Sequence, residues 1–108
     1  MILEDERVVC LKLTEERIGE LLKTAEQWKR EDEQWIVRKY RFPSFLKAVE
    51  FVQRVAAIAE AHNHHPMIVI EYKAVTLRLS TWSEGGLTEI DFVCARAFDE
   101  TYKAMKEV

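Results

Sequence analysis

The sequence is poor in cysteine, glycine and proline. Its 108 residues include two cysteines, three glycines and two prolines, beside 48% hydrophobic and 32% charged residues. Cys10 and Cys94 lie far apart in apolar surroundings, so they do not form the dense pattern that cross-links small secreted domains. The low glycine and proline content also argues against a disordered or fibrous chain. We expect a single globular domain over residues 1–108, since a chain of this length can bury a core without a metal or disulfide.

The sequence also has no excess of positive charge and no long hydrophobic run. The formal net charge is −3 and the 16 basic residues are spread along the chain, whereas nucleic-acid-binding surfaces gather them. No stretch approaches the roughly 18 apolar residues of a membrane-spanning helix, and the acidic residues 1–7 do not resemble a signal peptide. We therefore expect a cytoplasmic protein with no direct nucleic-acid partner and no membrane association.

Three segments space their apolar residues as amphipathic helices do. A capping residue precedes each one: Thr14, Ser44 and Thr88. The longest helix is predicted over residues 45–62, and Asn63 can end it in the left-handed conformation. Its apolar stripe is wide enough to face both a sheet and a partner helix. The predicted apolar faces are Ile18, Leu21, Leu22 and Ala25; then Phe45, Ala48, Val49, Phe51, Val52, Val55, Ala56, Ile58 and Ala59; then Ile90, Val93, Cys94, Ala97, Phe98, Thr101 and Met105.

The remaining segments are predicted to be strands that come in adjacent pairs. Residues 28–34 indicate a strand and its turn, and 35–42 is rich in β-branched and aromatic residues. Residues 67–72 are nearly all apolar, and 74–81 alternate, with Val75, Leu77 and Leu79 facing inward. The order α-β-β-α-β-β-α predicts an α+β fold, an antiparallel sheet with helices over one face. The other face must be solvated or covered by another subunit.

All three histidines lie within four residues, where the long helix passes into the third strand. His62, His64 and His65 carry imidazoles, which give and take protons near neutral pH. Neighbouring residues on a regular strand point to opposite faces, but the junction before Pro66 is irregular enough for His64 and His65 to reach one pocket. Glu60 lies in the last helical turn, where its carboxylate could orient an imidazole and stabilise its charge.

The spacing of these residues resembles the signature of the pterin-4a-carbinolamine dehydratases. The resemblance extends from about Trp28 to Asp91 and includes several uncommon residue types at fixed intervals. The pattern is Glu60-x-x-x-His64-His65-Pro66, five residues, Tyr72, nine residues, Trp82, eight residues and Asp91, with the flanking motifs Phe42-x-x-Phe45, Leu79-Ser80-Thr81 and Gly86-Leu87-Thr88-Glu89.

The resemblance implies three helices on one face of a four-stranded antiparallel sheet. It also implies dehydration of 4a-hydroxytetrahydropterin to quinonoid dihydropterin without a metal or bound cofactor. That reaction protonates the departing 4a-hydroxyl and removes the proton on N5. Two imidazoles in opposite protonation states could perform both transfers. We predict His64 and His65 to be the catalytic pair, with the acid and base roles not assigned between them.

Four further residues are predicted to bind or orient the substrate: Glu60, Pro66, Trp82 and Asp91. Many family members carry a third active-site histidine where this chain has Trp82. An indole can stack on a flat pterin and donate one hydrogen bond, but it exchanges no protons near neutral pH. His62 does not replace that histidine, because the family pattern does not require histidine there.

Each candidate also has a structural interpretation. His62 can simply be a favourable cation at a helix C-terminus, and Asp91 can complete the cap with Thr88. Glu60 can be a solvated helix residue, Trp82 can belong to the core, and Tyr72 is expected to pack in the sheet. A zinc site at the histidines is not expected, because no cysteine is near and Pro66 constrains the backbone.

Two alternative functions have the same fold. One is a non-catalytic interaction module, since animal relatives of the resembled family also act as dimerisation partners of a transcription factor. The other is a related enzyme on another pterin, such as one of molybdopterin metabolism. Catalysis is favoured, because a scaffold needs no imidazoles at these spacings. We expect a pterin as the small-molecule partner, and a homodimer or homotetramer through the helix at 45–62.

Overall fold

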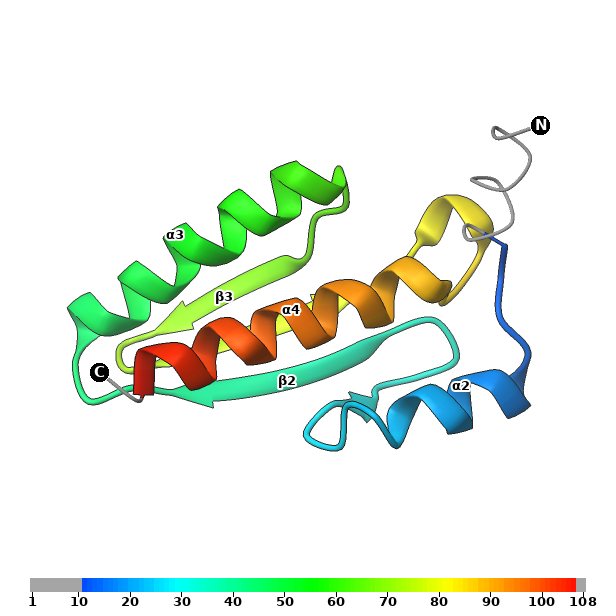
Figure 1. Ribbon diagram of the computed structural model, residues 1–108, viewed down its shortest axis with the longest axis horizontal. Helices are drawn as coiled ribbons and strands as arrows, with labels where there is room; N and C mark the ends of the chain where they lie inside the picture. The colour runs from blue at the N-terminus through cyan, green and yellow to red at the C-terminus, as the bar shows by residue number, and fades with distance from the viewer. Residues whose placement is uncertain (1–10, 107–108) are drawn as a thin grey trace.

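Three helices and a four-stranded antiparallel sheet make up the fold in the computed structural model, which describes residues 11–106 (Figure 1). The predicted order α-β-β-α-β-β-α is confirmed. Cys10 and the acidic residues 1–7 lie outside the described residues. The elements are α2 (Glu15–Leu22), β1 (Lys29–Arg30), β2 (Ile36–Arg41), α3 (Phe45–His62), β3 (Met67–Glu71), β4 (Ala74–Leu79), the short 3₁₀ helix η1 (Trp82–Glu84) and α4 (Glu89–Lys106).

The sheet has the strand order β1-β2-β4-β3, and every neighbouring pair is antiparallel. α3 and α4 run side by side across one face (Figure 1). On that face Val75, Leu77 and Leu79 of β4 are buried as predicted. α2 packs beside β1 against the same hydrophobic core. β3 forms one edge of the sheet, and its residues 67–70 are all exposed.

The caps of α2 and α3 form as predicted, whereas the Thr88 hydroxyl before α4 contacts Thr81 instead. The Arg17 N–H donates to the Thr14 hydroxyl at 3.1 Å, and the Lys47 N–H donates to the Ser44 hydroxyl at 3.2 Å. Asn63 ends α3 in the left-handed region with φ of 50°. No helix within the described range 11–106 is long and apolar enough to cross a bilayer.

The buried face of α4 differs from the prediction. Phe92 and Ala95 are fully buried, whereas Val93 and Ala97 are only half-buried. The reason is that α4 packs against α3 as well as over the sheet. Its buried surface is therefore wider than one stripe of residues spaced three and four apart, and it is centred on a different side of the helix. On α3, the residues toward the sheet and α4 are buried, while Phe45 and Ala56 on the outer side are exposed.

One carboxylate ties α4 to the sheet. Asp99 accepts hydrogen bonds from the Tyr40 hydroxyl at 2.6 Å, from Arg38 at 2.8 Å and from the Trp28 indole at 3.0 Å. Tyr40 and Trp28 are themselves buried, so their polar atoms need this partner. Burial, and secondarily the charge of Asp99, raise the pKa of Tyr40 far above its usual range. These hydrogen bonds fix where α4 lies along β2.

Candidate active site

A chain reversal after α3 places the two neighbouring histidines in different surroundings. α3 ends at His62, Asn63 turns the chain in the left-handed conformation, and the His64 N–H donates back to the carbonyl of Ala59 at 3.0 Å. The His64 side chain is 14% exposed, and that of His65 is 55% exposed. The irregular junction that the sequence predicted before Pro66 therefore exists, and it turns one ring inward and leaves the other toward solvent.

His64 is paired with a fully buried carboxylate from the other end of the sequence. Its Nε2 lies 2.6 Å from Asp91 Oδ1, and Asp91 is in the first turn of α4. The second carboxylate oxygen, Oδ2, accepts from the Thr88 N–H at 2.9 Å and from the Thr81 hydroxyl at 2.8 Å. Asp91 thus accepts from the Thr88 N–H at the start of α4 and contacts His64 with the same carboxylate. Its predicted role toward a substrate stays a prediction.

A buried thiol lies close to Asp91 on α4. Cys94 is buried one helical turn further along α4. Its burial, together with the Asp91 carboxylate, raises the pKa of the Cys94 thiol to about 11. The thiol is therefore neutral at physiological pH and has no nucleophilic character there.

His65 has its own carboxylate partner. Its Nε2 lies 2.6 Å from Glu60 Oε2, and the Glu60 side chain is 78% exposed. The sequence placed Glu60 four residues before His64, but α3 ends before that helical spacing is completed, and the chain reversal brings His65 to Glu60 instead. Each histidine therefore has a carboxylate, one pair buried and the other exposed.

The remaining predicted residues divide between the site and the far end of the sheet. Trp82 opens η1 directly after Thr81 and is 80% exposed, so the alternative that it belongs to the core is wrong. Pro66 is half-buried and leads from His65 into β3. Tyr72 lies in the two-residue turn after β3, one strand length from the histidines, and is exposed rather than packed in the sheet. Its φ of 57° fits the positive φ that such hairpin turns require.

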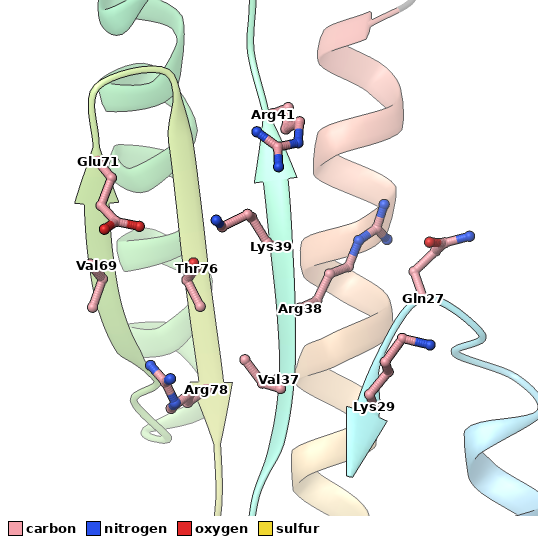
Figure 2. A pocket seen from close by; sticks show the side chains of 10 residues that line it. All are labelled: Gln27, Lys29, Val37, Arg38, Lys39, Arg41, Val69, Glu71, Thr76 and Arg78. Atoms are coloured by element: carbon pink, nitrogen blue, oxygen red, sulfur yellow. The ribbon is translucent and has the colours of Figure 1, made fainter. Parts of the chain in front are cut away.

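A hollow lies on the sheet face that α3 and α4 leave open (Figure 2). It has a volume of about 690 Å³, and its side chains include Lys29, Lys39, Arg41 and Arg78. Arg78 is bonded to Glu31 at 2.8 Å, which raises the pKa of its guanidinium. None of the described residues that line it is a histidine. The lining is rich in basic side chains and also includes the carboxylate of Glu71.

Two residues of the site escaped sequence reasoning. Thr81 and Thr88 both contact Asp91, and their hydroxyls lie 2.8 Å apart. Thr88 was expected only as a helix cap, and Thr81 only as part of a flanking motif. Within residues 11–106, no three histidine, cysteine, aspartate or glutamate side chains are arranged to hold a metal ion.

Comparison with known proteins gives one consistent family. The family model described as pterin 4 alpha carbinolamine dehydratase matches residues 11–101. A curated relative from Chloroflexus aggregans, provisionally named a pterin-4-alpha-carbinolamine dehydratase, is 45% identical over 89 residues, which is 82% of this chain and 95% of the relative. A relative from Sulfolobus acidocaldarius with the same provisional name is 38% identical over 90 residues, which is 83% of this chain and 98% of that one.

Solved structures share the fold. The crystal structure of a transcriptional coactivator/pterin dehydratase from Brucella melitensis superposes with a TM-score of 0.80 at 33% identity, over 84% of this chain and 98% of that one. A pterin dehydratase-like protein that is a RuBisCO assembly factor in the alpha-carboxysome gives a TM-score of 0.60 at 20% identity, over 70% of this chain and 89% of that one. This second likeness concerns the fold alone.

Proposed function

The chain belongs to the pterin-4a-carbinolamine dehydratase family, and we propose that it removes water from 4a-hydroxytetrahydropterin to give quinonoid dihydropterin, with His64 and His65 as the catalytic pair. The observation that carries the proposal is that each of these neighbouring histidines is bonded to its own carboxylate, at 2.6 Å in both cases. We further propose that the substrate is the tetrahydrobiopterin derivative, in cytoplasmic recycling of that pterin.

The reaction needs one proton delivered and one removed. Protonation of the 4a-hydroxyl releases water, the N5 proton is lost, and the C4a–N5 double bond forms, so the net proton count is unchanged. An imidazolium and a neutral imidazole match this requirement. Because an ionised carboxylate only accepts hydrogen bonds, the Nε2 atom of each ring carries a hydrogen toward Asp91 or Glu60. The Nδ1 atom of each ring then remains for the substrate.

Trp82 is proposed to bind the pterin by stacking. Its indole is largely free of protein contacts, being 80% exposed, and it follows directly on Thr81, which contacts the Asp91 carboxylate. An indole offers a flat apolar surface of the size of a pterin ring. Pro66 is proposed to constrain the backbone between His65 and β3, since proline removes one backbone freedom.

The exposed apolar edge favours association of this chain with a second copy. Met67, Ile68, Val69 and Ile70 lie on the edge strand β3 and are exposed, and such an edge pairs readily with another strand. Phe45 and Leu46 on α3 are exposed as well. We propose a homodimer or homotetramer that covers these residues. A coactivator role, as named for the Brucella melitensis protein, would use the same surfaces.

The test is the decay of enzymatically generated 4a-carbinolamine, followed by stopped-flow absorbance. Wild type is compared with His64→Ala, His65→Ala and the double variant. Removal of a general acid or base typically lowers the rate by about 10²–10⁴-fold, so the double variant should approach the uncatalysed decay. His62→Ala is the matched control, because His62 is exposed in the last turn of α3 and should react like wild type.

Circular dichroism verifies that each variant is folded. A wild-type rate equal to the uncatalysed decay would reject the dehydratase in favour of an interaction module or of another pterin. Near-normal rates in the double variant, beside an active wild type, would reject His64 and His65 as the catalytic pair.

A further inference from the structure

Behind the His64–Asp91 pair lies a short chain of hydroxyl groups. Thr81 Oγ1 is 2.8 Å from Asp91 Oδ2 and also 2.8 Å from Thr88 Oγ1. Thr88 and Asp91 are fully buried, and Thr81 is half-buried. Thr81 is in the segment that follows β4, while Thr88 directly precedes α4, so the chain joins two segments to the carboxylate.

Counting hydrogens gives this chain a direction. An ionised carboxylate has no hydrogen to donate, and a threonine hydroxyl has one. The single hydrogen of Thr81 must therefore point to Asp91 Oδ2, which leaves its oxygen to accept from the Thr88 hydroxyl. The Thr88 N–H also donates to Oδ2, at 2.9 Å. With Oδ2 occupied by two donors, Oδ1 is the oxygen that faces His64 Nε2.

We propose that Thr81 is a positioning residue for the dehydration, acting through Asp91. Its hydroxyl, aligned by Thr88, holds the carboxylate so that Oδ1 accepts from His64 Nε2–H and the Nδ1 atom of the ring faces the substrate. Thr81 touches no reacting atom in this role. The inference rests on the proposed function for its kinetic consequence, whereas the direction of the His64–Asp91 hydrogen bond follows from an ionised Asp91 carboxylate.

The backbone around Thr81 does not depend on its hydroxyl. The Thr81 N–H donates to the Gly86 carbonyl at 3.1 Å, and the Gly86 N–H donates to the Thr81 carbonyl at 3.4 Å. These bonds form an isolated antiparallel bridge. A substitution that keeps the β-branched shape and removes only the hydroxyl should therefore leave the segment in place.

The experiment compares Thr81→Val, Thr81→Ser and Ser80→Ala with wild type. Valine is isosteric and lacks the donor, whereas serine restores the donor without the methyl group. Ser80 is the matched control: it is the adjacent residue, it is buried, and its hydroxyl has no hydrogen-bond partner among the residues that the structure describes. The readouts are kcat and KM for 4a-carbinolamine, the thermal unfolding midpoint, and the ¹⁵N shifts of the His64 ring, which report the hydrogen bond between Nε2 and Asp91.

We expect Thr81→Val to lower kcat by about tenfold or more, since a hydrogen bond to a charged group is lost. KM should change by less than about twofold, because the lost contact is not to the substrate. The ¹⁵N signal of His64 Nε2 should shift and broaden in Thr81→Val, because the Asp91 carboxylate still accepts from this nitrogen but is no longer held in one orientation. Thr81→Ser should recover kcat to within about threefold of wild type, and Ser80→Ala should match wild type in all readouts.

Two results would overturn the inference: unchanged ¹⁵N shifts of the His64 ring together with unchanged kcat in Thr81→Val, or a loss of kcat that serine does not restore. A wild type without dehydratase activity would instead reject the proposed function. In that case the ¹⁵N spectra of wild type and Thr81→Val still decide whether Thr81 orients the Asp91–His64 pair.

Discussion

Replacing Asp91 by asparagine should reverse the hydrogen-bond direction at His64 while leaving the site nearly unchanged in shape. In the wild type, Oδ2 accepts from the Thr88 N–H and the Thr81 hydroxyl, and Oδ1 faces His64 Nε2. Asparagine must place its carbonyl oxygen at the Oδ2 position, because two donors point there. Its NH₂ group then faces His64, whose Nε2 must become the acceptor. The hydrogen of the neutral ring then moves to Nδ1, the nitrogen that we propose faces the substrate.

The size of the effect follows from that change of tautomer. A wrong tautomer with intact geometry lowers kcat by about 10⁴-fold in a serine protease triad, where the aspartate orients the imidazole in the same way. Here His65 retains its own partner, so we expect a loss of about 10²–10⁴-fold in kcat. Stability should fall by only about 1–2 kcal/mol, since the variant keeps the cap acceptor but loses a charge-assisted bond.

The assay is single-turnover decay of 4a-carbinolamine, together with urea unfolding of the same samples. Glu89→Gln is the control, because it makes the same acid-to-amide change in the same helical turn, at a side chain bonded to the partly exposed Arg17. An Asp91→Asn variant with a rate within about threefold of wild type would refute the orientation of His64 by Asp91. A variant that fails to fold is distinguished by its unfolding curve.

Asp99→Ala should lower the free energy of unfolding by about 3 kcal/mol, because it leaves the buried Tyr40 hydroxyl and Trp28 indole without their acceptor. Urea unfolding measures this loss. The control is Glu100→Ala at the next, exposed position, which should change the free energy of unfolding little. Because burial raises the pKa of Tyr40 in the folded state, its contribution to stability is complete below about pH 10 and is lost as the pH rises further. The urea midpoint of wild type should fall above that pH more steeply than the midpoint of Tyr40→Phe. Trp82→Ala should raise KM for the pterin. Its free energy of unfolding should stay within about 0.5 kcal/mol of wild type, since the side chain is exposed. Trp82→Phe should restore most of the binding, and an unchanged KM in Trp82→Ala would exclude stacking.

The parts of the fold that the sequence predicts are those with a local physical cause. α3 has the predicted bounds, because Ser44 satisfies its first amides and Asn63 adopts the left-handed conformation at its end. The alternation in β4 predicts which of its side chains are buried, because the strand lies in the middle of the sheet with one face under helices. In α3 the deciding contacts lie within a few residues in sequence. In β4 the burial follows from the alternation of side chains along a strand.

The contacts of the site depend on tertiary packing and could not be read from spacing. His64 and Asp91 are 27 residues apart, and only the packing of α4 against α3 brings them together. Which histidine Glu60 contacts depends on where α3 ends, so a spacing of four residues was misleading. Phe92 is likewise buried because α4 has two packing partners. The predicted apolar face assumed a single partner and so left Phe92 out.

The His64–Asp91 pair is buried and the His65–Glu60 pair is exposed, so substitutions in the two pairs should have different effects. Asp91 serves the cap of α4, the segment around Thr81 and His64 at once, so a change there alters stability and chemistry together. Glu60 and His65 come from one short stretch and are largely exposed, so their pair lies in contact with solvent. Asp91, by contrast, is held by hydrogen bonds from two segments of the chain besides His64, so the His64–Asp91 pair has a fixed geometry in the protein interior.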